Sequence, residues 1–588
     1  MYAIKEKVRT AATGAVESLY GIRETPQVQA THKDHSGDLT LVLFPLAKLK
    51  LGAIDRVGEA VGKKILESMP EVRSFNVVKG FLNLSLSDDF WQSTLTGSVD
   101  DDFFRPPPRG EKVMVEYCSP NTNKPIHLGH MRNMAIGESV CRILEAAGAE
   151  VVRACLFNDR GIHICKSMLA YLDAGGDDSP EKSGLKGDHL IGKYYVEFEK
   201  KYRTEVKELI ESGVAEAVAE NDAPSIKRCR QMLLDWEAGE PQTRALWKKL
   251  NDWVYEGFQQ TFQRFGVHFD LLLYESELWQ RGKLAVLDAL KTGAFYQKDD
   301  GSVWIDLSQD GLDQKLVLRS DGTTVYITQD IGTADFKDEL HRSNRSVYVI
   351  ANEQDYHMKV LKLALQRMGR KYADGLFHLS YGMVDLPTGR MKSREGTVVD
   401  ADDILQEMYD TARAATDELG KAESLSADEL HRLYETLGQG ALKYFLLKPE
   451  PVKRIVFNPA ESIDFKGHTG TFIQYVHARA CSVLRKAKGL ATDDGGAGPF
   501  HELEIAMLKH LAGFSETVGE AAEKLNPALV AHRVYDLARE YNRFYYELPI
   551  LKAESAPLVA RRVKISALTA RAVRFGLALL NIEAPEKM

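Results

Sequence analysis

The sequence predicts an α/β protein in three parts: a small α+β module, a central domain built on a doubly wound parallel sheet, and an all-α C-terminal bundle. Three observations lead to this prediction. A strand–loop–helix–strand succession begins shortly after residue 110, a stiff proline-rich segment precedes it, and from about residue 424 onward nearly the whole pattern is helical.

The N-terminal module is predicted to span residues 1–108. Helical periodicity covers Ala3–Tyr20 and Ile54–Met69, and the stretches LTLVLFPLAKL and FNVVKGFLNLSLS have the composition of strands. The segment RPPPRG, Arg105–Gly110, then supplies a stiff break, because consecutive prolines hold the backbone extended.

The central domain is predicted to span residues 109–450. KVMVEYC is a short apolar strand, Met131–Ala147 has helical periodicity with Gly148 as its stop, and EVVRACLF is a second strand. This βαβ unit is the seed of a Rossmann-like parallel sheet, to which VWIDL, VYVIAN and LFHLSYGMV are expected to add strands.

Two further regions are helical in pattern. A charged insertion is expected at about residues 161–280, packed around Trp236, Trp247, Trp253 and Trp279. Residues 451–588 are predicted to form the C-terminal helix bundle.

Bulk properties are typical of a globular enzyme of several domains. The chain has 588 residues and a formal charge of −8, with 44% hydrophobic and 27% charged residues, which argues against disorder. None of its six cysteines forms a CxxC pair, so we expect reduced thiols in the cytoplasm and no zinc site built from cysteines. The N-terminus lacks the apolar core of a signal peptide, and no uncharged apolar run is long enough to span a bilayer. The mild acidity is compatible with a nucleic-acid partner, which needs only a local basic face.

The loop between the first strand and the helix of the βαβ unit contains NTNKPIHLGHMRN, Asn121–Asn133. Loops at the carboxyl ends of parallel strands meet ligands, and the N-terminus of the next helix offers free N–H groups to a phosphate. Gly129 allows close backbone approach, and His127 and His130 can donate to phosphate oxygens. Metal ligation is the weaker interpretation, because helical zinc pairs are spaced His-x-x-x-His with a further ligand; two ordinary histidines near a turn are the other alternative.

A second candidate phosphate site is the basic loop GRMKSREG, Gly389–Gly396, which glycines bound on both sides. Arg390, Lys392 and Arg394 can neutralise phosphate charge from such a loop. A solvated basic turn is the alternative interpretation.

These stretches together resemble a known family. HLGH after VEYCSPNTNKP closely resembles the HIGH signature of class I aminoacyl-tRNA synthetases, in the form found in arginyl-tRNA synthetases. Further blocks resemble that family in its own order along essentially the whole chain: LFNDRGIHI, GDHLIGKYYVEF, LRSDGTTVYITQDIGTA, GMVDLPTGRMKSREGTVV, GTFIQYVHARACSVL and LLNIEAPEKM. His163 departs from the pattern, because the family usually has Gln at that place.

The resemblance implies an ATP-dependent ligase that joins L-arginine to tRNA(Arg). The carboxylate of arginine attacks the α-phosphate of ATP, giving arginyl-adenylate and pyrophosphate. The terminal ribose 2′-hydroxyl of the tRNA then takes the arginyl group and AMP leaves. Mg²⁺ is expected to accompany the ATP, with no dedicated protein metal site. The family also implies an N-terminal domain at the tRNA elbow, an anticodon-binding C-terminal domain, and a monomer.

The same resemblance assigns ATP binding and catalysis to the two signatures. The expected ATP site comprises Lys124, His127, Gly129, His130, Arg390, Met391, Lys392, Ser393 and Arg394, of which Lys124, His127, His130, Lys392 and Arg394 are the catalytic candidates. Aligned on the family's KMSKS loop, Ser393 stands in place of the second lysine. A lysine just before the HIGH motif is thought to compensate in such enzymes; Lys124 matches it, and Lys392 is the rival.

Substrate choice should depend on carboxylates, because a guanidinium group prefers a planar, bidentate acceptor. Glu116 ends the first strand at the ligand crevice, and Asp330 follows Tyr326 by four positions, on one face if that segment is helical. By resemblance, the arginine pocket comprises Glu116, Ser119, Asn121, Tyr326, Asp330 and Gln354. A helix cap or a surface acid is the alternative for Asp330.

Contacts with tRNA are expected from basic and aromatic side chains of the last bundle, since unpaired bases need charge and stacking. The candidates there are Tyr475, His477, Arg479, Arg539, Tyr541 and Arg543, and the family resemblance adds Phe81 and Asn83 for the tRNA elbow. For any one of them, a solvated helix face or a core position is the alternative.

Two other functions compete with this one. Another HIGH-superfamily enzyme, either a different class I synthetase or a nucleotidylyltransferase, is disfavoured by the pair of acids Glu116 and Asp330 and, for the latter, by chain length. An RNA-binding protein with an inactive site is disfavoured by the intact His127 and His130 and by the basic loop.

Overall fold

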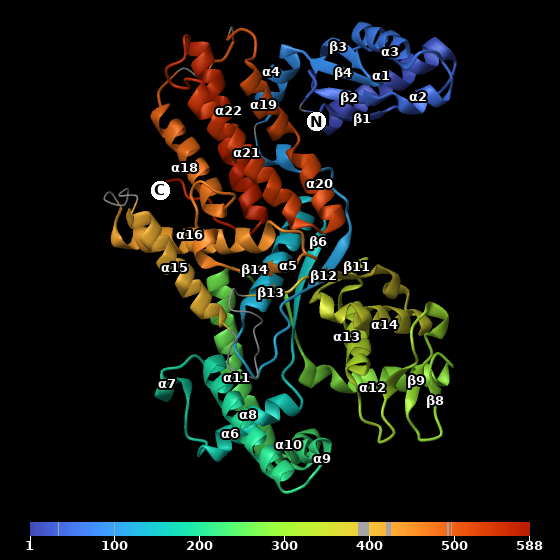
Figure 1. The fold of residues 1–588 in the computed structure, drawn as a ribbon, viewed down its shortest axis with the longest axis vertical. Coiled ribbons are helices and arrows are strands. Elements are labelled where there is room, and N and C mark those ends of the chain that lie inside the picture. Colours follow the sequence, from blue (N-terminus) through green and yellow to red (C-terminus); the bar gives the residue numbers. More distant parts are fainter. Residues whose placement is uncertain (33, 99, 386–398, 419–424, 491–492, 496) are drawn as a thin grey trace.

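The computed structural model describes residues 1–588 apart from 33, 99, 386–398, 419–424, 491–492 and 496. The central parallel sheet lies between a helical insertion at one end of the molecule and a C-terminal helical bundle at the other, with the small N-terminal domain beside that bundle (Figure 1). Among the helices of the described ranges, none combines the length and the apolar character that crossing a bilayer requires.

The N-terminal domain is a four-stranded antiparallel sheet in the order β1-β2-β4-β3, covered by helices. Its elements are α1 (Tyr2–Tyr20), β1 (Gln27–Ala30), β2 (Leu39–Val42), α2 (Phe44–Lys48), α3 (Ile54–Ser68), β3 (Val72–Val78) and β4 (Phe81–Leu86). The two predicted helices are confirmed as α1 and α3. LTLVLFPLAKL is a strand only in its first part, because Pro45 opens α2, where its missing N–H removes no intrahelical bond.

The segment after this sheet packs on the C-terminal bundle. It comprises α4 (Asp88–Gly97) and the 3-10 turn η1 (Asp101–Phe104). The buried Phe104 ring lies 5.6 Å from the rings of both Phe514 and Phe575. The end of the predicted 1–108 domain is therefore tied by its contacts to the bundle.

The central sheet has five parallel strands in the order β12-β11-β5-β6-β7. They are β5 (Lys112–Glu116), β6 (Glu150–Phe157), β7 (Leu271–Tyr274), β11 (Arg345–Ala351) and β12 (Leu376–Tyr381). The order reverses between β5 and β11, and at such a switch point the loops that leave the two strands diverge and open a crevice for a ligand. Helix α5 (Leu128–Ala146), which follows β5, begins earlier than the predicted Met131.

Two strands differ from the sequence prediction. VWIDL forms β9 (Val303–Ile305), but β9 pairs with β8 (Tyr296–Gln297) and β10 (Lys315–Leu318) in a separate antiparallel sheet. β7 lies inside the range predicted for the helical insertion, yet it pairs with β6 in the central sheet. Its run LLLY is too short for periodicity to separate it from the helices around it.

The insertion is helical over α6 (Ile162–Asp173), α7 (Pro180–Ser183), α8 (Gly187–Glu211), α9 (Glu216–Asp222), α10 (Pro224–Glu237) and α11 (Pro241–Phe265). The expected tryptophan packing is confirmed: the Trp236 ring lies 5.4 Å from Trp247 and 6.4 Å from Trp279, and Trp253 packs on Tyr171.

Helices flank the sheet and build the C-terminal bundle. Those near the central sheet are α12 (Glu275–Lys291), α13 (Tyr326–His341), α14 (Asp355–Arg367) and α15 (Ala401–Glu418), with the short strands β13 (Val384–Asp385) and β14 (Ile455–Val456) pairing in parallel. Those that follow are α16 (Ala427–Leu447), α17 (Pro459–Ser462), α18 (Gly470–Lys486), α19 (Glu502–Ala512), α20 (Phe514–Lys524), α21 (Pro527–Glu547) and α22 (Ala556–Leu579).

Candidate active site

The two signature histidines form a reciprocal cap at the N-terminus of α5. Nδ1 of His127 accepts a hydrogen bond from the backbone N–H of Gly129 at 3.1 Å, and Nδ1 of His130 accepts one from the backbone N–H of His127 at 3.3 Å. A Cβ at Gly129 would lie 3.0 Å from Cε1 of His127, so glycine at this position keeps the ring in place. An Nδ1 that accepts carries no proton, so in each neutral ring the proton resides on Nε2.

Both imidazoles are neutral at physiological pH. Burial lowers the pKa of His127 to about 3, and the nearby charge of Lys124 acts in the same direction. Burial, then His127 and Lys124, also holds the pKa of His130 well below its usual range. The pair therefore offers two fixed N–H donors and no charge, and Lys124 is the cation beside them.

Lys124 and His127 line a cavity of about 450 Å³ together with residues of α8 and with Asp400. The α8 residues include Lys193 and Tyr195, and the hydroxyl of Tyr195 lies 3.3 Å from Nδ1 of His163. His163, which departs from the family pattern, is thus linked to a wall of this cavity. The volume falls in the range of small-molecule sites.

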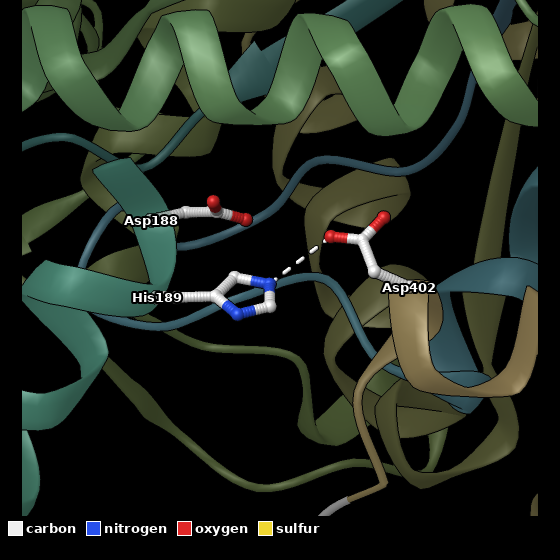
Figure 2. Close-up of side chains that lie close together, drawn as sticks. All are labelled: Asp188, His189 and Asp402. Atoms are coloured by element: carbon white, nitrogen blue, oxygen red, sulfur yellow. Dashed lines mark hydrogen bonds and ion pairs between the residues drawn. The ribbon is translucent and has the colours of Figure 1, made fainter. Parts of the chain in front are cut away.

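An ion-pair network joins α8 to the first residues of α15, beside the same cavity. Figure 2 shows the Asp188 carboxylate and the His189 ring, both from α8, facing Asp402. Nε2 of His189 lies 3.0 Å from a carboxylate oxygen of Asp400 and 3.0 Å from one of Asp402. Lys186 forms ion pairs with Asp188, at 3.3 Å, and with Asp402.

The network does not have the chemistry of a metal centre, although Asp188, His189 and Asp402 bring three possible ligand atoms together. Burial would lower the pKa of His189, but its hydrogen bonds to Asp400 and Asp402 outweigh burial and raise it to about 10. A doubly protonated imidazole cannot coordinate a metal. The Lys186 ammonium already pairs with both Asp188 and Asp402, so the chain's own cations neutralise the acids.

The network also holds the segment after residue 398 against the signature loop. Asp400 forms an isolated antiparallel bridge with His127, and the N–H of Ala401 donates to the carbonyl of Ile126 at 2.9 Å. The predicted basic loop precedes this segment, but Arg390, Met391, Lys392, Ser393 and Arg394 lie outside the described residues.

The backbone after β5 turns through the left-handed region at two residues that are not glycine. Cys118 has φ 72° and Ser119 has φ 42°. Such conformations cost of order 1–3 kcal/mol each and gather at functional sites. Asn133 of α5 accepts from the N–H of Cys118 at 2.6 Å, and Asn121 forms a parallel bridge with Asn158, so this turn is held from both sides.

Glu116, predicted for the arginine pocket, has a partner within the protein. Its buried carboxylate forms an ion pair at 2.6 Å with Lys337 of α13, whose ammonium also lies over the ring of Tyr348. Burial opposes the charge of Lys337, but Glu116 and Tyr348 raise its pKa overall. Glu116 therefore stays a prediction for the arginine pocket, with Lys337 as its ion-pair partner.

The other acid, Asp330, is accessible. Asp330 lies on α13, and its carboxylate is hydrogen-bonded to Nε2 of His357 at 2.6 Å. That hydrogen bond raises the pKa of His357. Tyr326, at the first position of the same helix, is 78% exposed. Gln354, also exposed, ends the 3-10 turn η3 (Asn352–Gln354) directly after β11, on the opposite side of the switch point from Asn121.

Sequence reasoning missed Glu275, which begins α12 directly after β7. Burial raises its pKa to about 7; Arg160 opposes that shift, whereas Asp159 and Asp330 add to it. A carboxyl group poised near neutrality beside two other acids is a candidate ligand for a cation. The sequence feature that indicates Glu275 is its position directly after a strand of the parallel sheet. Predicting residues 161–280 as a helical insertion hides this strand.

In the C-terminal bundle, Arg479 lies among three tyrosines, of which Tyr545 and Tyr546 are exposed. Its guanidinium is 4.8 Å from the ring centroids of Tyr475 and Tyr545 and 4.9 Å from that of Tyr546. We call these four residues the tyrosine–arginine cluster. Tyr546 is 69% exposed, so the cluster presents an aromatic face to solvent.

Three predicted tRNA contacts are corrected because their side chains are inside the protein. Tyr541 and Asn83 have no exposed surface, and Asn83 bonds the hydroxyl of Thr40 and the amide of Asn76. His477 is 3% exposed and its Nδ1 donates to the carbonyl of Pro585.

The remaining candidates lie at the surface. Arg543 is exposed and pairs with Glu547 at 2.9 Å, and Arg539 pairs with Asp536 at 3.4 Å. In the N-terminal domain, the partly exposed Phe81 packs edge-on against Phe44.

Comparisons with known proteins match this architecture along its length. A model of the family described as tRNA synthetases class I (R), catalytic domain, matches residues 104–458, and one of the DALR anticodon binding domain matches residues 473–588. Relatives named arginine–tRNA ligase from Bacteroides thetaiotaomicron and Flavobacterium psychrophilum are 45% and 46% identical, with 100% of each chain covered.

Solved structures agree with these relatives. The arginyl-tRNA synthetase of Thermus thermophilus superposes with a TM-score of 0.81 at 26% identity, covering 99% of this chain and 100% of that one. The arginyl-tRNA synthetase of Plasmodium falciparum, at a TM-score of 0.77, 19% identity and coverage of 100% and 99%, shares the fold. With its catalytic region matched by the family model and its whole length matched by close relatives, the chain belongs to the class I arginyl-tRNA synthetases.

Proposed function

We propose that the protein joins L-arginine to tRNA(Arg) with the use of ATP, by way of arginyl-adenylate, and releases AMP and pyrophosphate. The observation that carries this proposal is the meeting of two neutral imidazole donors and the Lys124 ammonium at the N-terminus of α5, in a chain whose relatives are arginine–tRNA ligases. Such a site acts by positioning and by stabilising charge around phosphorus.

The phosphates of ATP are proposed to bind at this helix terminus. The Nε2–H groups of His127 and His130 donate to phosphate oxygens, and Lys124 supplies positive charge beside them. Because backbone N–H groups hold both Nδ1 atoms, the donors need no reorientation when charge develops in the transition state. Lys392 and its neighbours stay proposed contacts for the leaving pyrophosphate.

Mg²⁺ is proposed to enter with ATP and to offset phosphate charge. The acids nearest the cavity favour this route over a protein-held ion, because His189 and Lys186 already neutralise Asp400 and Asp402.

Arginine is proposed to bind with its guanidinium group between Asp330 and Glu275, near Tyr326. Its α-amino and carboxylate end would face the strained turn at Ser119 and the two loops of the switch point, which carry Asn121 and Gln354. Catalysis of the first step then requires only that the carboxylate meet the α-phosphate in line.

The tRNA is proposed to contact all three predicted domains, 1–108, 109–450 and 451–588. Unpaired anticodon bases can stack on the tyrosine–arginine cluster, with Arg539 and Arg543 near the phosphate backbone. The edge-packed pair of Phe81 and Phe44 offers an apolar surface to the tRNA elbow.

We also propose that the enzyme works in the cytoplasm as a monomer. The six cysteines are free and five of them are buried, which suits a reducing compartment.

A charging assay tests the function directly. Purified protein is incubated with ATP, bulk tRNA and each standard amino acid in turn, and esterified tRNA is measured. Only arginine should be attached, and omission of ATP should abolish the reaction. Attachment of another amino acid would assign a different synthetase activity, and no attachment at all would leave an RNA-binding protein.

Lys124→Ala tests the compensating lysine. Loss of one charged contact to the reacting phosphates should lower the rate of adenylate formation by roughly 10²–10³-fold, with tRNA affinity nearly unchanged. The measurement is arginine-dependent AMP release in the presence of tRNA, with Lys48→Ala, an exposed lysine of α2, as the matched control. Normal turnover in Lys124→Ala would transfer the role to Lys392.

Arginine binding should weaken as pH falls through 7. Glu275, with its pKa of about 7, must be ionised to hold a guanidinium group, so its protonation below pH 7 removes an acceptor. The KM for arginine should rise roughly tenfold from pH 8 to pH 6, as expected for one group titrating at 7. His357, which competes more strongly for Asp330 when protonated, acts in the same direction.

Two variants separate these contributions. Glu275→Gln should raise the KM for arginine at pH 8 and shrink its pH dependence, whereas Glu277→Gln, an exposed acid on the same helix, should keep the wild-type profile. A KM in Glu275→Gln that equals the wild-type value at both pH values would remove Glu275 from the pocket.

A further inference from the structure

A cavity with several charged lining residues lies where the catalytic domain meets the C-terminal bundle, apart from the site at the start of α5. Its volume is about 610 Å³. Residues from α5, the end of α11, α16 and the chain after α22 line it, and we call it the junction cavity. Its charged and titratable lining residues are Arg142, Arg264, His431, Arg432, Glu435, Lys443 and Glu583.

Lys443 of α16 is the unusual residue of this lining. It is 4% exposed, and its ammonium lies 5.0 Å from the ring centroid of Phe265. No carboxylate of the described residues forms an ion pair with it. A buried charge without a partner is unfavourable by several kcal/mol, so the amine either loses its proton or awaits an anion.

The other cations of the lining already have partners. Arg264 pairs with Glu435 at 3.0 Å, and Arg432 pairs with Glu583 at 3.0 Å. Arg142 pairs with the buried Glu138 at 2.7 Å, so the positive excess of this lining centres on Lys443.

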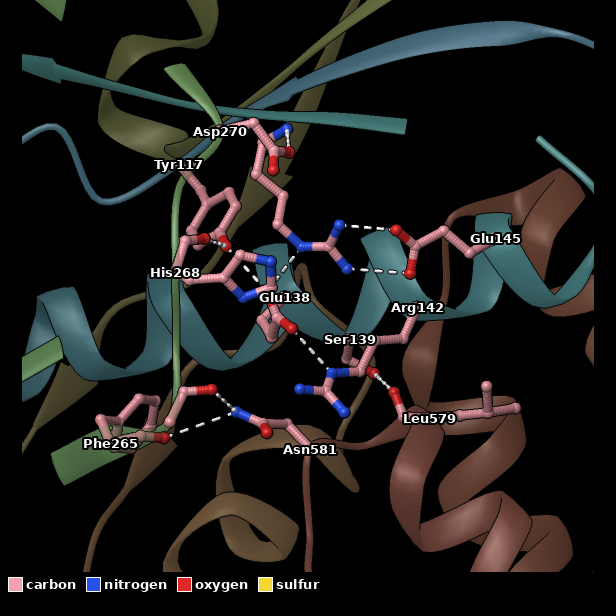
Figure 3. Close-up of polar contacts among 12 residues, drawn as sticks. Tyr117, Glu138, Ser139, Arg142, Glu145, Phe265, His268, Asp270, Leu579 and Asn581 are labelled. Carbon is pink, nitrogen blue, oxygen red and sulfur yellow. Dashed lines mark hydrogen bonds and ion pairs between the residues drawn. The ribbon is translucent and has the colours of Figure 1, made fainter. Parts of the chain in front are cut away.

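The guanidinium group of Arg142 has a nitrogen, Nη2, that can donate to a ligand. Figure 3 shows the guanidinium next to Glu138. Its Nε donates to Glu138 at 2.7 Å, and its Nη1 donates to the carbonyl of Ala578, near the end of α22, at 3.2 Å. Within the described ranges no hydrogen bond involves Nη2, so an anion could accept from it and from Lys443 together. Asn581, which donates to the carbonyl of Gly266 at 3.0 Å, closes the same end of the cavity.

We propose that the junction cavity binds a small phosphate-like oxyanion, with Lys443 and Arg142 as its principal ligands. Guanidinium and ammonium groups are the side chains that hold phosphate oxygens, and the cavity has room for an anion with bound water. The oxyanion supplies the partner that Lys443 lacks and bridges α5 of the catalytic domain to α16. Either a free oxyanion or a phosphodiester of bound RNA has this chemistry.

Thermal unfolding in potassium sulfate tests the proposal, with potassium chloride of matched ionic strength as the reference. Sulfate should raise the unfolding midpoint of the wild type and of Lys443→Arg at pH 6.5. Lys443→Met keeps the length of the side chain and removes its charge, so its sulfate affinity should fall roughly tenfold or more. Salting effects and binding at the ATP site are common to all three proteins and cancel in the comparison.

The pH dependence gives a second readout with a known sign. Burial lowers the pKa of Lys443 to about 7; Arg142 adds to that shift, and Glu138, Glu435 and Glu583 oppose it. The amine is charged below this pKa, so wild-type sulfate affinity should fall from pH 6.5 to 8.5, whereas Lys443→Arg should keep its affinity. Sulfate itself does not titrate in this range.

Anomalous diffraction from wild-type crystals soaked in selenate locates the anion without any variant. A peak within contact distance of Lys443 and Arg142 is expected; an empty cavity, or sulfate shifts that are equal in wild type and Lys443→Met, would overturn the proposal. Added tRNA separates the two sources: displacement of sulfate assigns the site to an RNA phosphodiester, and retention assigns it to a free oxyanion. A shift with acetate but none with sulfate would also contradict the proposal.

Discussion

Helix α5 fixes the catalytic core through polar side chains that are buried. Arg132 has no exposed surface and donates to the carbonyl of Gly382 at 2.6 Å, next to the segment that leads into the second signature. Asn133 donates to the carbonyl of Val349 in β11 at 2.7 Å. Glu138, fully buried, anchors the network of Figure 3. A shift of this helix would leave several of these groups unpaired. Breaking a buried ion pair by itself destabilises a protein by about 3–5 kcal/mol.

The same helix carries the site that we propose for the phosphates of ATP. Its N-terminus carries two imidazoles whose Nδ1 atoms accept from the backbone, so their Nε2–H groups are aimed before ATP arrives. Positive charge is proposed to come from Lys124 and the second signature. The bridge between His127 and Asp400 places Asp400, which follows that signature in the sequence, against the first one. The far end of α5 meets α22 through the hydroxyl of Ser139, which donates to the carbonyl of Leu579 at 2.8 Å. The anticodon-binding bundle therefore contacts the helix whose N-terminus is the proposed phosphate site.

Local patterns predicted much of the fold, since α5, β5 and β6 are visible in the periodicity of nearby residues. Partnerships between distant residues were not visible. Lys337 of α13 pairs with Glu116 of β5, and nothing near either residue in the sequence indicates that pair. Tyr541 satisfied the composition expected of an RNA-binding helix, but composition does not say which side of α21 faces the core. Glu275 was missed because a strand of four residues among helices is too short to show a recognisable alternation of hydrophobic residues.

The central claim is that His127 and His130 act as neutral donors through Nε2. Neutron diffraction from deuterated crystals at neutral pH shows this directly, because deuterium atoms on nitrogen scatter strongly enough to be placed. Each ring should carry deuterium on Nε2 and none on Nδ1, with the backbone N–D of Gly129 and of His127 directed at the bare nitrogens. Deuterium on both nitrogens of either ring would make it a charged imidazolium, and would contradict the account.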